Sequence, residues 1–359
     1  MLLNQISISR LRNLKETTLD FEQLNVIYGD NGSGKTSVLE AIHYLALGRS
    51  FRTHLASRVI NYEHDNFLLF GRANDNALGV QRFKNGDVTV KINGEKAKKL
   101  TELLDILPLQ LMTPESFELL TGGPKIRRQF VDWGVFHLDE NFMPIWNKCK
   151  RLLKQRNSLL KRKASYKEIS FWDIELVQCS LALSELRNQY INSFNPVLQG
   201  IIERFLPDTD VTVSYSQGWD KKADLAELFQ KNYSRELTLG YTLAGPHKAD
   251  LKLRCGNIPA SDALSRGQLK LLVCALRIAQ GVHLKQMVDK QTIYLVDDLS
   301  SELDSQKRQL LIDQLVATQA QLFLSVIDAA QIKQQTSKYQ TKMFHVEQGV
   351  ITQENIERE

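Results

Sequence analysis

A glycine-rich segment near the start of the chain constrains the fold more than any other feature. It reads Gly29-Asp30-Asn31-Gly32-Ser33-Gly34-Lys35-Thr36, which is the pattern of a phosphate-binding P-loop. The apolar run at 23–28 predicts a buried strand before the loop. Residues 37–47 predict a helix after it, which Gly48 ends. Because strand, loop and helix come in the order that the pattern requires, a chance glycine-rich turn is the weaker interpretation.

Each residue type in this segment has a role in holding phosphate. The glycines let backbone N–H groups turn toward phosphate oxygens, and the helix N-terminus adds partial positive charge there. We expect Lys35 to reach the β- and γ-phosphates and the Thr36 hydroxyl to ligate Mg²⁺. The expected nucleotide-binding residues are Gly29, Asp30, Asn31, Gly32, Ser33, Gly34, Lys35, Thr36 and Ser37.

Two adjacent acids follow an apolar run in the last quarter of the chain. Residues 292–296 predict a core strand, and Asp297 and Asp298 come at its carboxyl end, where ligands bind in open α/β sheets. Asp297 is expected on the Mg²⁺ side, acting through water. Asp298 is expected to polarise the attacking water or accept its proton. The structural alternative is a strand end followed by a helix that starts near Asp304.

A second loop lies ahead of this strand. Residues 264–268 resemble the signature loop of ABC-type ATPases and precede an apolar helix at 269–279, which puts Ser265 at the helix N-cap. Besides capping, the hydroxyl and helix N-terminus form a second anion site. In such ATPases this site grips the nucleotide held by a partner's P-loop, so Ser265, Gly267 and Gln268 are expected to bind the nucleotide of a second copy. Arg266 either strengthens that contact or is solvated.

Composition restricts the class of protein only broadly. Net charge is +5 and the pI about 8.8, which is compatible with nucleic-acid binding. The cysteines are scattered and form no C-x-x-C motif, so neither a disulfide framework nor a zinc site is expected. Reduced cysteines, with no evident signal peptide or membrane span, predict a cytoplasmic protein.

The motifs divide the chain into a split domain and an insertion. We expect an ATPase domain from 1–110 and 240–359 and a mainly helical lobe at 111–239. Asn-Gly pairs at 85–86 and 93–94 predict β-hairpins, and a polar turn at 163–165 predicts a helical hairpin. Strand character returns at 211–215. Because the insertion lacks sustained heptads, its arm is expected to be short.

Basic residues cluster on the predicted helical arm, where aromatic residues are few. This composition favours contact with the backbone of duplex DNA over base stacking, although part of the cluster only solvates the helix. The cluster comprises Lys148, Lys150, Arg151, Lys154, Arg156, Lys161, Arg162, Lys163 and Lys167. From it we select Lys154, Arg156 and Lys161 as DNA-binding residues. Outside the cluster, Arg127 and Arg128 have either a DNA-binding or a structural role. Arg49 and Arg52 are the next candidates for DNA binding. His247 has either a packing or a chemical role.

Together these motifs resemble the RecF family of bacterial recombination mediators, which are relatives of SMC heads. The shared segments run in family order over nearly the whole chain: 31–36, 48–52, 113–115, 122–124 with Arg127 and Arg128, 130–132, 245–248, 264–268, 296–298 and 302–304. Four positions, in three segments, depart from the family. Lys248-Ala249 replace a usual Arg-Asp, Arg266 replaces Gln or Gly, and Ser325, a predicted switch residue at the end of a core strand, replaces Thr.

The resemblance implies an α/β fold, an ABC/SMC-type P-loop ATPase head assembled from N- and C-terminal segments with an inserted helical lobe and short arm. It implies ATP and Mg²⁺ as cofactors and an ATP-dependent homodimer that closes on DNA near single-strand/double-strand junctions. Slow, DNA-stimulated hydrolysis would then reset this clamp. RecR and RecO are the implied partners, in loading RecA on gapped DNA during repair, replication and the SOS response.

Two other functions fit part of the sequence. An ATPase subunit of a membrane transporter would share the nucleotide motifs but lack the basic arm and the Gly-Pro-His segment at 245–247. A nucleotide-gated binding module without turnover would share the loops, but Asp298 favours hydrolysis.

Overall fold

The computed structural model describes residues 2–298, 303–336 and 338–354. It forms two compact units, one from residues 1–116 and 276–359 and one from 117–275. The expected insertion at 111–239 differs from the second unit, because residues 240–275 group with the helices. Strand β10 (Asp250–Cys255) pairs with β9 (Val211–Ser216) over its whole length, and this pairing ties the 240–275 segment to unit 2.

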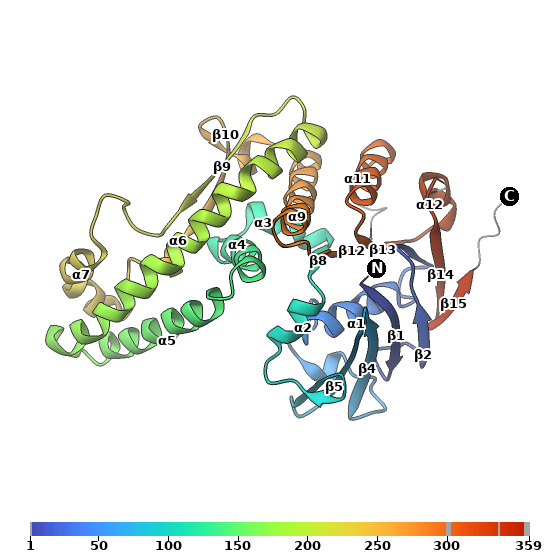
Figure 1. Ribbon diagram of the computed structural model, residues 1–359, viewed down its shortest axis with the longest axis horizontal. Helices are drawn as coiled ribbons and strands as arrows, with labels where there is room; N and C mark the ends of the chain where they lie inside the picture. Colours follow the sequence, from blue (N-terminus) through green and yellow to red (C-terminus); the bar gives the residue numbers. More distant parts are fainter. Residues whose placement is uncertain (1, 299–302, 337, 355–359) are drawn as a thin grey trace. The chain divides into compact units, whose positions relative to one another are not determined.

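A six-stranded sheet joins the two ends of the chain within unit 1 (Figure 1). Its strands are parallel except for the outermost, which is antiparallel. In spatial order they are β15 (Val350–Glu354), β14 (Thr341–Glu347), β3 (Leu24–Tyr28), β13 (Gln321–Val326), β12 (Ile293–Val296) and β8 (Leu109–Met112). Since β3 lies between β14 and β13, the P-loop strand is paired on both sides with strands from the C-terminal segment.

The second sheet of unit 1 is antiparallel and comes from the first hundred residues. In spatial order its strands are β2 (Thr17–Asp20), β1 (Leu3–Ser9), β4 (Asn66–Ala73), β5 (Asn76–Phe83), β6 (Val88–Ile92) and β7 (Glu95–Lys96). The two Asn-Gly pairs lie in the β5–β6 and β6–β7 turns, and Asn93 takes the left-handed φ of 53° that such turns need. Both predicted hairpins are therefore confirmed.

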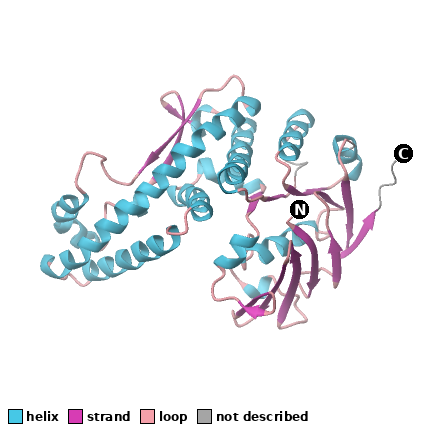
Figure 2. Cartoon of the chain, viewed as in Figure 1, coloured by secondary structure: helices cyan, strands magenta, loops and turns pink. Residues whose placement is uncertain are grey.

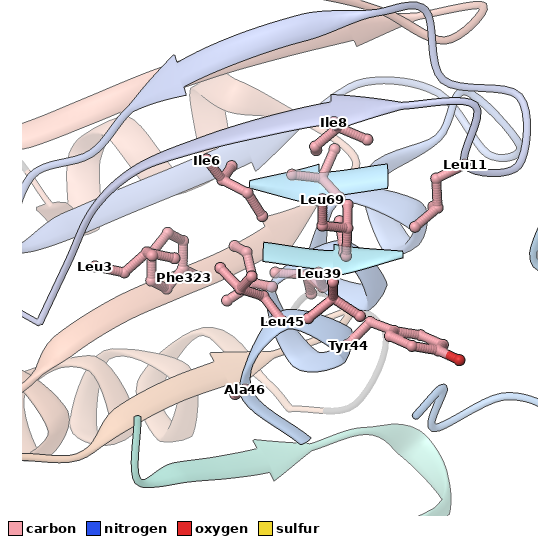
Figure 3. Packing of buried hydrophobic residues seen from close by; sticks show 14 of the residues in the cluster. Leu3, Ile6, Ile8, Leu11, Leu39, Tyr44, Leu45, Ala46, Leu69 and Phe323 are labelled. Atoms are coloured by element: carbon pink, nitrogen blue, oxygen red, sulfur yellow. The ribbon is translucent and has the colours of Figure 1, made fainter. Parts of the chain in front are cut away.

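Helix α1 (Lys35–Leu47) carries the main core of unit 1. Figure 3 shows Leu39 and Leu45 of this helix among Ile6 of β1, Leu69 of β4 and Phe323 of β13. The same buried cluster contains residues of both sheets, so α1 fills the layer that they share. The helix ends at Gly48, whose φ of 67° gives the left-handed C-cap that the sequence predicts.

The other helices of unit 1 are short. They are α2 (Thr101–Ile106), α11 (Ser305–Ala317) and α12 (Ala329–Thr336), with 3₁₀ turns η1 (Ala56–Arg58) and η2 (Pro114–Phe117). Asp304 is the N-cap of α11 and accepts a hydrogen bond from the Lys307 backbone N–H. This confirms the predicted start of that helix.

Unit 2 is mainly helical (Figure 2). Its elements are α3 (Glu118–Thr121), α4 (Pro124–Leu138), α5 (Phe142–Lys161), α6 (Tyr166–Phe205), α7 (Leu225–Leu239), η3 (Pro246–Lys248) and α8 (Ala260–Ala263), with a small sheet in the order β11 (Ile258–Pro259), β10, β9. Helix α9 (Arg266–Val288) contains the boundary between the two units. Within the described residues, no helix is both long and apolar enough to span a membrane.

Helices α5 and α6 form the predicted hairpin and the short arm. Ser165 caps α6 in a capping box, in which its hydroxyl accepts from the Glu168 N–H while the Glu168 carboxylate accepts from the Ser165 N–H. The turn before this cap contains Lys163, with a left-handed φ of 57°. This local chemistry explains why a polar turn, and not one continuous helix, follows Lys161.

Candidate nucleotide site

The P-loop adopts a conformation that only glycine allows at two of its positions. Gly29 has a φ of 146°, and a Cβ there would lie 2.2 Å from the backbone oxygen of Val346 on β14. Gly34 has a φ of 126° and directly precedes α1. The loop is also tethered, because the Gly349 N–H donates to the backbone oxygen of Ser33 at 2.8 Å. The sequence pattern therefore produces a fixed, open ring of backbone groups ahead of a helix N-terminus.

Lys35 spans this ring. Its Nζ lies 2.7 Å from the Gly29 backbone oxygen and 2.9 Å from that of Asp30. Burial lowers the pKa of Lys35, and the carboxylates of Asp298, Asp297 and Asp30 oppose this shift. The ammonium group is thus held over the loop by two backbone carbonyls, with three carboxylates nearby. From this position it can bind a phosphate oxygen.

Thr36 and Asp297 meet at the carboxyl edge of the parallel sheet. The Thr36 hydroxyl lies 3.1 Å from Asp297 Oδ1, although the two residues are 261 positions apart in the chain. The Ser325 hydroxyl donates to the same Oδ1 at 2.7 Å. Burial raises the pKa of Asp297, and the Ser325 and Thr36 hydrogen bonds lower it. One hydroxyl and one carboxylate fit a Mg²⁺ ion that takes its remaining ligands from phosphate and water.

Asp298 has a special backbone conformation. Its φ is 53°, a left-handed value that non-glycine residues rarely adopt outside turns. Its N–H donates to the Ser325 hydroxyl at 2.8 Å, so Ser325 bridges the two acids. Such strain persists where surrounding contacts enforce it and is concentrated at functional sites.

A cavity of about 1,020 Å³ opens beside these residues. Its wall includes Lys35, Thr36, Asp297, Asp298 and Ser325, and this volume lies at the upper end of the range for ligand sites. The structure therefore brings together the P-loop and the two predicted acids. It also places Ser325 in contact with both acids. Residues 113–115 and Arg52, named above as family segments and as a DNA candidate, line the same cavity.

Sequence reasoning missed several residues of this wall. Arg12, Asn13, Arg58 and Tyr62 line the cavity, yet they lie in loops without periodicity or a motif. Arg12 is fixed by a bidentate ion pair with Glu40, whose two oxygens each lie 2.8 Å from a guanidinium nitrogen. Glu40 is fully buried in α1. A charged residue on the otherwise apolar face of the predicted helix was the one available signal, and its partner could not be read from the sequence.

Comparison with known proteins identifies the family of this chain. The family model described as the RecF/RecN/SMC N-terminal domain matches residues 2–352. The chain is 55% identical over 357 residues to "DNA replication and repair protein RecF" of Shewanella denitrificans, covering 98% of this chain and 99% of that protein. It is equally similar to the RecF protein of Shewanella sp. strain W3-18-1. The chain belongs to the RecF/RecN/SMC family, and within it to the RecF proteins.

Solved structures show the same fold. A structure described as the recombination mediator protein RecF with an ATP analogue in the RecFOR pathway has a TM-score of 0.85 at 23% identity, covering 98% of each chain. An SMC head bound to the C-terminal winged-helix domain of ScpA has a TM-score of 0.61 at 14% identity. The predicted fold class, an ABC/SMC-type ATPase head, is confirmed.

The signature loop of this RecF-family chain lies in unit 2. Ser265 is exposed and caps α9, accepting from the Gln268 N–H at 3.3 Å, while Gln268 Oε1 accepts from the Ser265 N–H at 2.9 Å. The predicted N-cap role of Ser265 is therefore confirmed. Both Ser265 and Arg266 are exposed to solvent. The family segment at 302–304 lies partly outside the described residues, which include its Leu303 and Asp304.

The structure contradicts one predicted DNA-binding residue. Arg156 is fully buried, with Nε 2.7 Å from Asp173 and Nη1 2.5 Å from Glu236. Its guanidinium also lies over the Phe229 ring. Helical spacing turned this arginine toward α6 and α7, whereas Lys154 and Lys161 on the same helix are exposed.

Arg127 and Arg128 are held by contacts inside unit 2. Arg127 makes a bidentate ion pair with Asp250, at 2.7 and 3.0 Å, and Arg128 donates to the Ala249 backbone oxygen at 2.8 Å. Both of these acceptors come from the segment where the family departure at 248–249 lies. His247 packs beside them, with Nε2 2.9 Å from the Thr242 backbone oxygen. These contacts support a structural role for Arg127 and Arg128 and a packing role for His247.

Proposed function

We propose that this protein is an ATP-dependent DNA-binding protein of recombinational repair and replication. The observation that carries the proposal is the convergence of Lys35, Thr36, Asp297, Asp298 and Ser325 on one cavity. These residue types, in this geometry, bind a nucleoside triphosphate and hydrolyse it. The names of the relatives, which are DNA replication and repair proteins, supply the context of DNA.

Each side chain has a role in binding or hydrolysis. The P-loop backbone and Lys35 hold the phosphates. Thr36 and Asp297 would hold a Mg²⁺ ion, which would supply positive charge to offset that of the phosphate oxygens. Asp298 orients the attacking water and accepts its proton. The Ser325 hydroxyl fixes the Asp297 carboxylate and the Asp298 backbone relative to each other, because it hydrogen-bonds to both. Slow, DNA-stimulated hydrolysis is the expectation that the family resemblance gives for this site.

ATP joins two copies of the chain in this proposal. Ser265 and Arg266 are exposed at the start of α9, where a helix N-terminus favours anions. Their own hydrogen bonds are satisfied by the cap, so a phosphate contact requires no rearrangement of the loop. The homodimer then closes over DNA, and hydrolysis reopens it.

DNA contact is assigned to the exposed face of α5. Lys154 and Lys161 lie on this face, and Arg162 and Lys163 follow in the exposed turn. Such lysines bind phosphate and carry little sequence information, which suits a junction-binding protein. RecR and RecO are the proposed partners in loading RecA on gapped DNA. The family resemblance implies them, and the solved homologue described as part of a RecFOR pathway supports them.

Size measurement with and without nucleotide tests the proposal. We expect a monomer without nucleotide or with ADP, and a dimer with ATP that gapped DNA stabilises. Ser265→Arg should bind ATP normally but fail to dimerise and to hydrolyse it. Gln178→Arg, which adds the same charge at an exposed position of α6, is the matched control. An ATP-dependent dimer that persists in Ser265→Arg would contradict the shared site.

A further inference from the structure

Unit 2 contains a second cavity, of about 390 Å³, which shares no lining residue with the nucleotide cavity. Residues of helices α4, α5, α6 and α7 and of the turn at 244–247 line it. Its apolar wall is formed by Trp146, Leu153, Leu176, Leu183 and Phe229. A cavity of this volume with an apolar wall and a few polar groups has the composition of a small-ligand site.

Two buried polar groups in its wall lack partners. Ser180 on α6 is 0% exposed, and its hydroxyl has no hydrogen-bond partner among the described residues. The Nδ1 of His247 is likewise buried and unpartnered in that part of the chain. Leaving a buried polar group unpaired is unfavourable, so an occupant that pairs with His247 Nδ1 is favoured.

The protonation state of His247 defines what its free nitrogen can accept. Burial lowers the pKa of His247 to about 4, so the ring is neutral at physiological pH. Nε2 lies 2.9 Å from the Thr242 backbone oxygen and must donate its proton to that acceptor. Nδ1 is therefore a hydrogen-bond acceptor, and its missing partner must be a donor such as an N–H group.

The charges around the cavity favour an anion. Its lining includes the cations of Lys125, Arg128 and Lys150. Asp132 is the one acid among the described lining residues, and Arg187 neutralises it through a bidentate pair at 2.7 and 3.0 Å. Arg128 interacts electrostatically with Asp250 and Asp132, so Lys125 and Lys150 are the two lining cations that remain without a carboxylate inside the cavity wall.

We propose that this cavity binds a carboxylate on an apolar body that also carries an N–H group. An N-acylated apolar amino acid has all three features. Its side chain packs on Trp146 and Phe229, its N–H donates to His247 Nδ1, and its carboxylate faces Lys150. The same chemistry occurs at the free C-terminal residue of a polypeptide, so a small molecule and a chain end are the two possible sources.

Saturation-transfer NMR of the full-length protein with N-acetylphenylalanine tests the proposal. We expect saturable binding with a Kd of about 1 mM or tighter, which corresponds to a few satisfied contacts. N-acetylphenylalaninamide, which lacks the charge, should bind about tenfold more weakly. Lys150→Gln should produce a similar loss, whereas Lys231→Gln, at an exposed position of α7 outside the cavity wall, should produce none.

A six-residue peptide that ends in phenylalanine separates the two sources. Binding of the free-acid peptide at least as tightly as N-acetylphenylalanine supports a polypeptide end, and binding of the small molecule alone supports a free metabolite. The proposal is overturned if no probe saturates at about 10 mM, where a millimolar site would be full. It is also overturned if acid and amide bind equally, or if Lys150→Gln and Lys231→Gln behave alike.

Discussion

Replacing Arg156 should destabilise unit 2 strongly without any effect on ATP binding. Arg156→Met keeps the length and apolar stem of the side chain but leaves Asp173 and Glu236 buried without their cation. The change removes three hydrogen bonds donated by the charged guanidinium, to Asp173, Glu236 and Thr242, each worth about 1.5–3 kcal/mol. Breaking one side of a buried ion pair costs about 3–5 kcal/mol in measured cases, and we expect a loss in that range.

The pH dependence gives this prediction a second, independent readout. Burial raises the pKa of Asp173, and the bond to Arg156 lowers it. In Arg156→Met the folded-state pKa rises further above the unfolded value of about 3.9, so the folded state binds the extra proton as pH falls. The difference in unfolding free energy between wild type and variant should therefore shrink as pH falls from neutral toward the unfolded-state pKa.

Urea unfolding followed by tryptophan fluorescence measures this loss. All four tryptophans of the chain lie in unit 2, at Trp133, Trp146, Trp172 and Trp219. The signal therefore reports the unit that contains Arg156. Lys154→Ala, two residues away on the same helix and exposed, is the matched control and should change stability by less than about 0.5 kcal/mol. A loss below about 1 kcal/mol for Arg156→Met, or one independent of pH, would refute the argument.

Three further predictions concern the nucleotide and DNA sites. Lys35→Ala should weaken ATP binding at least about a hundredfold in calorimetry, because it removes the cation over the P-loop; near-native affinity would contradict that position. Asp298→Asn should bind ATP normally, since Asp297 is intact, yet hydrolyse it about a hundredfold more slowly in single-turnover assays; normal turnover would place the general base elsewhere. Lys154→Ala with Lys161→Ala should flatten the slope of log K against log salt by about 0.9 per lost phosphate contact in anisotropy with gapped DNA. An unchanged slope would exclude α5 from the DNA surface.

The local elements of this protein were predictable because short-range chemistry determines them. The P-loop strand and helix, the Asn-Gly hairpins and the turn after Lys161 each depend on residues within a few positions of one another. Ser265 at the N-cap of α9 and Asp304 at that of α11 belong to the same class. In all of these the physical cause is a backbone conformation or a capping hydrogen bond that the neighbouring sequence specifies.

The boundary of the helical unit was not predictable in this way. Residues 240–275 follow the insertion in sequence and were expected with the ATPase segments. The pairing of β10 with β9 placed them in unit 2. Pairing of two strands across 33 intervening residues depends on packing of their faces, for which neither strand carries a local signal.

By itself, therefore, the sequence determined that the chain has a P-loop, a signature loop and two acids at a strand end, because those motifs encode backbone geometry locally. Only the tertiary structure decided which charged side chains are exposed to solvent and which are buried in ion pairs. It placed Arg156 in a buried ion cluster and left Lys154 in solvent, although both lie on one helix. It also brought Ser325 to Asp297 and Arg12 to Glu40. The physical reason is that burial and ion pairing depend on which faces pack together, and charge alone does not reveal that.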